Sequence, residues 1–218
     1  MPLHHKENQM SIEKANNKKE KDELSGRKAG KLYPISKGYL VVDNDKCCGC
    51  KTCMMVCSLA HEGIVDLAAS RIQVVEDNFG RFPNDIEIQI CKQCVNPTCI
   101  PACKSGALHI DVNGIRIVNE EKCTGCKLCM SACSQVPNRI GWNGRKKIAT
   151  KCDLCTNAPY LSKPGGIDGS QACVLACPMK AIAMVKKTPK QRDGAGYDID
   201  LRKDSWGDLL GFHKGKDS

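Results

Sequence analysis

Short apolar runs of strand length are spaced along the middle of the chain and are separated by polar or cysteine-rich loops. None approaches the about 18 apolar residues that a membrane-spanning helix needs. The runs predict strands, at residues 37–42, 71–75, 86–90, 105–110, 115–118 and 179–185. A short helical turn is expected at the end of each cysteine-rich loop.

The two ends of the chain differ from this middle part, which spans residues 37–185. Residues 1–36 are rich in Lys, Glu and Asn and lack hydrophobic periodicity, which predicts a polar N-terminal arm. Residues 186–218 predict a C-terminal tail, which either docks on a partner or folds back on the body. Its large apolar side chains are Trp206, Leu209, Leu210 and Phe212.

The body contains an internal repeat. The segments KCCGCKTCMMVCS at 46–58 and KCTGCKLCMSACS at 122–134 are identical at nine of 13 positions, at an offset of 76 residues. A second pair of segments, at 91–110 and 152–184, aligns with an offset of 74 residues for its later cysteines. The body is therefore interpreted as a duplicated unit, because such repeats define the architecture of a chain.

Composition points to metal rather than to an organic core. Cysteine makes up 17 of the 218 residues, whereas aromatic side chains make up only 4%. Residues 1–31 contain no apolar stretch of the length that a secretory signal needs, so we expect a cytoplasmic chain. In a reducing compartment this many cysteines favour metal sites over a disulfide network.

Sixteen of the cysteines fall into four groups of four. The first and third groups have the spacing Cys-x2-Cys-x2-Cys-x3-Cys, in which three thiolates wrap one face of a [4Fe–4S] cubane and the fourth ligates a neighbouring cubane. The second group has a wider loop, and the fourth has 17 residues between its two cysteine pairs and ends before Pro178. In chain order the groups are Cys47, Cys50, Cys53 and Cys57; Cys91, Cys94, Cys99 and Cys103; Cys123, Cys126, Cys129 and Cys133; and Cys152, Cys155, Cys173 and Cys177. We expect four [4Fe–4S] clusters.

Two alternatives stay open at this point. Structural zinc is a rival at the fourth group, because two short cysteine pairs separated by 17 residues also describe a zinc ribbon. A regulatory DNA-binding protein would account for the formal charge of +9, but it would need a recognition helix, and the sequence predicts none.

Three residues near the cysteine groups are given no chemical role. Cys48 is expected to be a buried thiol, because a ligand at this position would break the spacing to Cys50. His61 and His109 are interpreted as packing or surface residues. No acid–base pair and no open coordination position is found, so we expect no catalytic residues and no enzymatic activity of the chain on its own.

The four groups, in this order and with this duplication, resemble the four-cluster iron–sulfur subunits of molybdenum and tungsten pterin oxidoreductases such as dimethyl-sulfoxide reductase and formate dehydrogenase. The phrases KGYLVVDNDKC and CSLAHEG are most similar to soluble partners of tungsten aldehyde ferredoxin oxidoreductase-like enzymes, including tungsten benzoyl-CoA reductases. The resemblance implies an α+β fold of two interleaved ferredoxin-like units, with repeat halves at about 37–118 and 119–185.

The resemblance also implies partners. They are a large catalytic subunit with pterin-bound tungsten or molybdenum, and a ferredoxin or further redox subunit as electron donor or acceptor. It implies no nucleic acid and no membrane span. The chain would then carry electrons for an aldehyde oxidoreductase or a benzoyl-CoA reductase. A free-standing polyferredoxin is the alternative, because it would contain the same cysteine groups.

Within this family the first cysteine group pairs with the fourth and the second with the third, and each pair exchanges its fourth cysteines. The implied ligand sets are Cys47, Cys50, Cys53 and Cys177 (site 1); Cys57, Cys152, Cys155 and Cys173 (site 2); Cys91, Cys94, Cys99 and Cys133 (site 3); and Cys103, Cys123, Cys126 and Cys129 (site 4). This exchange would place paired clusters next to each other, as electron tunnelling requires.

The charge of +9 counts every cysteine as neutral. Four thiolates around an oxidised cubane leave each site at about −2, so four sites would bring the chain to about +1. The excess of Lys and Arg is therefore interpreted as counter-charge for buried anions rather than as a surface for nucleic acid.

Overall fold

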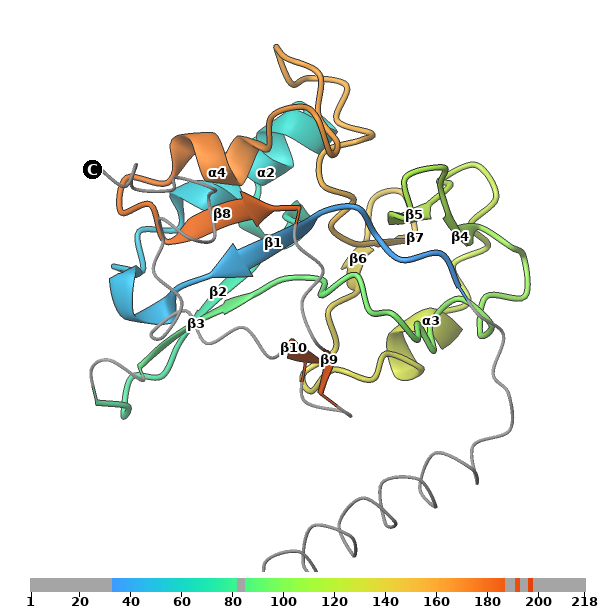
Figure 1. Ribbon diagram of the computed structural model, residues 1–218, viewed down its shortest axis with the longest axis horizontal. Helices are drawn as coiled ribbons and strands as arrows, with labels where there is room; N and C mark the ends of the chain where they lie inside the picture. Colours follow the sequence, from blue (N-terminus) through green and yellow to red (C-terminus); the bar gives the residue numbers. More distant parts are fainter. Residues whose placement is uncertain (1–32, 82–84, 187–190, 193–195, 198–218) are drawn as a thin grey trace, which may run out of the picture. The chain divides into compact units, whose positions relative to one another are not determined.

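The computed structural model describes residues 33–81, 85–186, 191–192 and 196–197 of the chain (Figure 1). Most of the predicted N-terminal arm and most of the predicted C-terminal tail, including its apolar side chains, lie outside these residues. In the described part of the chain, no helix combines the length and the apolar character needed to cross a membrane.

The strands of the described residues pair in two-stranded antiparallel sheets. β1 (Tyr39–Val42) pairs with β8 (Ile182–Val185), β2 (Gln73–Glu76) with β3 (Ile86–Gln89), β4 (Leu108–Ile110) with β5 (Arg116–Val118), β6 (Gly141–Asn143) with β7 (Ile148–Thr150), and β9 (Gln191–Arg192) with β10 (Gly196–Tyr197). Such small sheets are marginal alone and depend on packing against other elements.

The β1–β8 sheet joins the two ends of the body. Tyr39 lies opposite Val185 and Val42 lies opposite Ile182, so the chain before the first cysteine group runs beside the chain after the fourth. Figure 1 shows this sheet with α2 (Thr52–Glu62) and α4 (Ala172–Ala176) close to it, and these two helices pack on each other. The packing brings the first and fourth cysteine groups into one half of the body.

The helices begin inside the cysteine loops. α2 contains two cysteines of the first group, and α3 (Leu128–Ser131) and α4 each contain one cysteine. Two short 3-10 helices, η1 (Asn44–Lys46) and η2 (Leu67–Ala69), lie before and after α2. α2 ends at Gly63, whose left-handed φ of 71° lets its N–H bond the carbonyl oxygen of Leu59.

The predicted strands are confirmed, and the predicted helical turns are corrected in position. Each of the six apolar runs contains a strand. The helices start within the cysteine groups rather than after them, and the second group has hydrogen-bonded turns in place of a helix. The hairpin of β6 and β7 was not predicted, because its three-residue strands flank a polar turn and show no clear alternation.

The core mixes aliphatic side chains with thiols. The larger cluster includes Leu40, Ile72, Ile115, Leu154, Cys53, Cys57, Cys152 and Cys173. A smaller one forms around Leu108, Cys129, Ile140 and Ala149. Among the described residues, Tyr39 is the one fully buried aromatic side chain. The scarcity of aromatic residues is therefore met by an interior in which sulfur atoms take much of the space.

The loop that follows the first cysteine pair of the fourth group depends on a glycine. A Cβ at Gly165 would lie 1.9 Å from the carbonyl oxygen of Cys155 and 2.9 Å from its Cβ. The neighbouring Gly166 donates its N–H to the carbonyl oxygen of Leu154 at 2.8 Å, so the two chain segments are held in contact.

We expect Gly165→Ala to lower the thermal unfolding midpoint by about 2–10 °C, because the added methyl group overlaps backbone atoms. Circular dichroism of the anaerobically purified chain measures this midpoint. Gly144→Ala is the matched control, since a Cβ at Gly144 meets no atom within 4 Å. Equal midpoints for the two variants would show that the loop relaxes at no cost.

Candidate metal centres

All four cysteine groups share one backbone feature. The residue before the second cysteine has a left-handed conformation in every group: Gly49 (φ 68°), Gln93 (φ 48°), Gly125 (φ 69°) and Leu154 (φ 57°). A left-handed residue in a tight loop turns successive N–H groups toward one side, which makes a concave site for an anion. Glycine adopts this conformation at little cost, whereas Gln93 and Leu154 are held in it against their side-chain preference.

The fourth cysteine of each group accepts a hydrogen bond from a backbone N–H. The bonds run from Arg71 N to Cys57 Sγ (3.4 Å), Leu108 N to Cys103 Sγ (3.2 Å), Arg139 N to Cys133 Sγ (3.4 Å) and Ala181 N to Cys177 Sγ (3.3 Å). N–H donors to sulfur stabilise a thiolate and tune a metal bound to it. The four groups are therefore built alike.

Site 1 joins the first and fourth groups. Burial raises the pKa of Cys53 to about 12, and the negative charges of Cys47, Cys177 and Cys50 contribute to the increase. The same four cysteines line one hollow of the surface. Cys177 thus lies with three cysteines that precede it by more than a hundred residues in the sequence.

Site 2 joins the same two groups, but here three cysteines come from the fourth group and one from the first. Burial raises the pKa of Cys173 well above its ordinary value, and the charges of Cys152, Cys57 and Cys155 raise it further. All four thiols of this site are buried. Cys57 is the member that comes from the first group.

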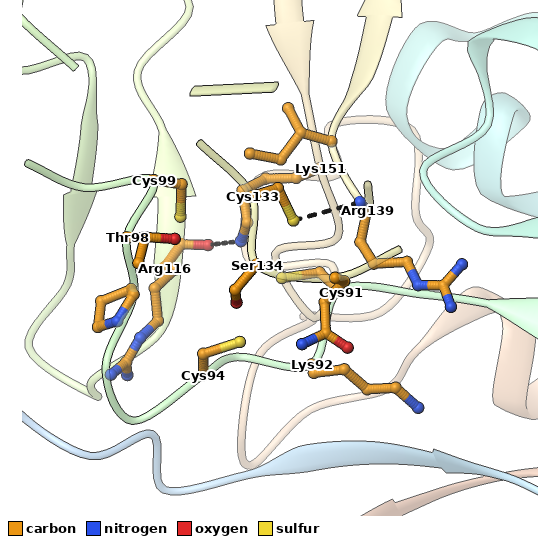
Figure 2. A pocket seen from close by; sticks show the side chains of 13 residues that line it. Cys91, Lys92, Cys94, Thr98, Cys99, Arg116, Cys133, Ser134, Arg139 and Lys151 are labelled. Carbon is orange, nitrogen blue, oxygen red and sulfur yellow. Dashed lines mark hydrogen bonds between the residues drawn. The ribbon is translucent and has the colours of Figure 1, made fainter. Parts of the chain in front are cut away.

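Site 3 joins the second and third groups and lines the pocket in Figure 2. Burial and the neighbouring charges of Cys91, Cys133 and Cys94 raise the pKa of Cys99 to about 12, while the positive charge of Lys151 acts in the opposite direction.

Site 4 joins the first three cysteines of the third group to Cys103, the fourth cysteine of the second group. Burial and the charges of Cys103, Cys123 and Cys126 raise the pKa of Cys129. The structure thus brings the sixteen cysteines together in the four sets that the resemblance implies. That each set ligates a cluster stays a prediction.

Comparison with known proteins identifies the family. Residues 84–187 match the 4Fe–4S dicluster domain. A polyferredoxin-like subunit of aliphatic sulfonate oxidoreductase from Pyrococcus furiosus is 41% identical over 123 residues, which cover 56% of this chain and 67% of that protein. An iron–sulfur protein from Rhodospirillum rubrum is 31% identical over 189 residues, which cover 79% of this chain and 91% of that protein.

The chain belongs to the 4Fe–4S iron–sulfur electron-transport proteins. One of the subunits of sulfite dehydrogenase from Allochromatium vinosum is also similar, at 31% identity over 161 residues, or 65% of each chain. The dicluster match contains the second, third and fourth cysteine groups, and the first group lies before it.

One cysteine of this iron–sulfur protein belongs to none of the four ligand sets. None of the 17 cysteines forms a disulfide in this structure. Cys48 is exposed to solvent, and the expectation of a buried thiol is therefore wrong. It lies beside Cys47 at the hollow of site 1, where the four sulfur donors of the set are already supplied by other cysteines.

A buried ionic network beside site 2 was not predicted. His61 Nε2 lies 3.0 Å from Asp153 Oδ1, and Arg71 Nη1 donates to Asp153 Oδ2 at 2.8 Å. His61 Nδ1 also lies 3.8 Å from Cys57 Sγ and 2.9 Å from the carbonyl oxygen of Cys57. The signal for His61 was present in the sequence, because four residues separate it from Cys57 and one helical turn places both on one face.

This network fixes the charge of its members. Burial lowers the pKa of His61, but its contacts with Asp153 and Cys57 outweigh burial and raise the pKa to about 9. Burial raises the pKa of Asp153, but His61 and the Arg71 guanidinium hold it well below its usual range. Site 2 is therefore flanked by a carboxylate that stays ionised.

Site 3 has buried cations in place of such a carboxylate. The side chains of Arg116 and Lys151 are 1% and 2% exposed. Arg116 donates to the carbonyl oxygens of Gly114 and Val95, and Lys151 donates to those of Arg116 and Cys152. No ion pair joins either cation to a carboxylate among the described residues. Two buried cations without an anion are costly, so site 3 fits an anionic iron–sulfur group.

Donor spacing bears on the zinc alternative. Zinc would need four donors at about 2.0–2.3 Å from one centre. Within the described ranges, no three thiol, imidazole or carboxylate groups converge on a single-ion position. The concave loops and the N–H donors to sulfur are features that an anionic cluster requires.

We expect Asp153→Asn to lower the thermal unfolding midpoint by about 6 °C or more, because it leaves the buried Arg71 without its carboxylate. Differential scanning fluorimetry under anaerobic conditions checks this value. Asp168→Asn is the control, since Asp168 pairs with Lys186 in full contact with solvent and should leave the midpoint unchanged. A midpoint for Asp153→Asn equal to that of the control would contradict a structural role for the network.

Proposed function

We propose that this iron–sulfur protein is the electron-transfer subunit of a cytoplasmic oxidoreductase and carries four [4Fe–4S] clusters, one at each site. The observation that carries the proposal is the exchange of cysteines between distant groups. Each site combines the first three cysteines of one group with the fourth cysteine of the group paired with it. Each set supplies four sulfur donors, which is the complete protein ligation of a [4Fe–4S] cluster.

The sites follow one another in the order 1, 2, 3, 4. Cys53 of site 1 raises the pKa of Cys173 in site 2, and Cys91 of site 3 raises the pKa of Cys152 in site 2. Cys99 of site 3 packs in the same small core as Cys129 of site 4. Neighbouring sites are thus within electrostatic range or in one packed core, which is the proximity that electron transfer between them needs.

The two ends of this series open to solvent. Cys50 of site 1 and Cys126 of site 4 are exposed, whereas every thiol of site 2 is buried. On this proposal electrons would enter and leave at sites 1 and 4, where a donor and an acceptor protein would have access. A bound [4Fe–4S] cluster supplies one-electron oxidation and reduction at each position.

The residues of the chain hold the clusters, shield them and adjust their charge. The loops present N–H groups, the fourth cysteines accept N–H donors, and the aliphatic core excludes water. With four thiolates at every site, no coordination position is left for a substrate. Catalysis belongs to a partner, for which we propose a large subunit with pterin-bound tungsten or molybdenum, as in an aldehyde oxidoreductase or a benzoyl-CoA reductase.

Metal analysis tests the number of clusters. The anaerobically purified chain should contain about 16 iron atoms and about 16 acid-labile sulfides, four of each for every [4Fe–4S] cluster. About 12 iron atoms and one zinc would instead indicate a structural zinc at the fourth cysteine group. Dithionite should bleach the visible absorption of the bound clusters.

Substitution of single cysteines tests the ligand sets. We expect Cys57→Ala to reduce the iron content toward about 12 atoms, because site 2 loses one of its four donors. Cys48→Ala is the matched control, since Cys48 is a neighbouring thiol outside every set, and it should keep about 16. Equal iron contents in the two variants would remove Cys57 from the ligands.

Purification from the native organism tests the partner. We expect a tagged chain to retain a large subunit that contains tungsten or molybdenum, as measured by plasma mass spectrometry of the complex. A chain that purifies alone, with all its clusters and full redox activity, would favour the free polyferredoxin.

A further inference from the structure

Site 3 is surrounded by more buried positive charge than the other sites. Its pocket is lined by four cysteines together with Lys92, Arg116, Arg139 and Lys151. Arg139 has one carboxylate partner, Glu87, at 2.7 Å, and Glu87 itself is about half exposed. Figure 2 shows the ammonium group of Lys151 among the thiols, whereas the charged ends of Lys92, Arg116 and Arg139 extend outward from them.

Lys151 occupies the central position in this group. Its side chain extends from the end of β7 toward the thiols of Cys99, Cys133 and Cys91 in Figure 2. Its ammonium group donates to the carbonyl oxygens of Arg116 and Cys152, the latter at 3.1 Å. An ammonium group has three donors, and these two bonds account for two of them.

The neighbouring cations increase the positive field. Arg116 lies completely inside the protein, and its Nε has no hydrogen-bond partner; the same holds for Nε and Nη1 of Arg139. The residues that line the pocket thus include four basic side chains and no carboxylate.

The buried cations of site 2 are paired. Arg71 is paired with Asp153 and Glu120, and His61 is paired with Asp153. Cys50 of site 1 and Cys126 of site 4 are exposed to solvent, which screens nearby charges. A buried cation acts through a lower effective dielectric constant and so has a stronger effect than an exposed one.

We propose that Lys151, supported by Arg116 and Arg139, gives site 3 the highest reduction potential of the four sites, so that the first electron taken up by the chain resides there. This inference rests on the proposed function, because it requires a cluster at each site. Reduction adds one negative charge to a site, and fixed positive charge beside it stabilises the reduced state. The step moves one electron from a reduced neighbouring site, which is oxidised, to site 3, which is reduced, with no bond or proton exchanged.

Redox titration of the full chain, monitored by electron paramagnetic resonance, tests the proposal. We expect Lys151→Met to lower the highest of the four reduction potentials by at least the equivalent of a tenfold change in the equilibrium constant, about 59 mV for one electron. Lys151→Arg should keep this reduction potential close to the wild-type value, because it keeps the positive charge.

Lys104→Met is the matched control. Lys104 follows Cys103 of site 4 directly and is exposed, so the same change of charge beside a ligand should move the potentials less. The proposal is overturned if Lys151→Met leaves the highest potential in place, or shifts a lower one instead, while iron content stays at about 16 atoms.

A second variant covers a failure of Lys151→Met to fold. Arg139→Gln removes a charge from the rim of the same pocket, and we expect it to lower the highest potential in the same direction. An unchanged potential in this variant, with all clusters present, would count against the proposal. A wild-type chain without four clusters would contradict the proposed function itself, whatever the potentials.

Discussion

Repulsion between buried thiolates is the constraint on which the structure of this protein depends. At site 2, four buried thiols lie within electrostatic range of one another, and burial with mutual charge raises the pKa of Cys152 and Cys173 well above the ordinary value. Such a set keeps its protons unless positive charge replaces them. Bound iron would supply most of that charge, and backbone N–H donors to the fourth cysteines supply part of the rest.

The same constraint explains the basic composition. A formal charge of +9 on a chain of this size would suggest an anionic partner. Several cations instead lie inside the protein: Arg116 and Lys151 are fully buried beside site 3, and Arg71 is held against Asp153 beside site 2. Positive side chains in these positions act on the sites themselves and are not available to nucleic acid.

Cysteine spacing and hydrophobic pattern predicted the parts of the structure that depend on local sequence. The four groups, the strands on either side of them and the glycines at 49 and 125 follow from short motifs. The left-handed backbone at Gln93 and Leu154 was not predictable, because neither residue prefers it and the loop imposes it.

The contacts that distinguish the four sites are long-range. Arg71 reaches Asp153 across 82 positions of the sequence, and Lys151 reaches the carbonyl oxygen of Arg116 across 35. No periodicity or motif links such residues, since tertiary packing alone brings them together. Sequence therefore shows where cysteines gather, whereas the structure shows how the surroundings of otherwise similar sites differ.

Those differences matter most in the middle of the series. Burial disfavours any added negative charge, so site 2, whose thiols are all buried, and site 3, whose thiols are half-buried, would be harder to reduce than the exposed end sites if nothing compensated. Site 3 has buried cations without a carboxylate partner among the described residues, Lys151 and Arg116, whereas at site 2 both His61 and Arg71 are paired with Asp153. On the proposed order, neighbouring sites then differ in whether the buried cations beside them are paired with a carboxylate. An electron that passed site 2 would be stabilised at site 3 by this unpaired positive charge.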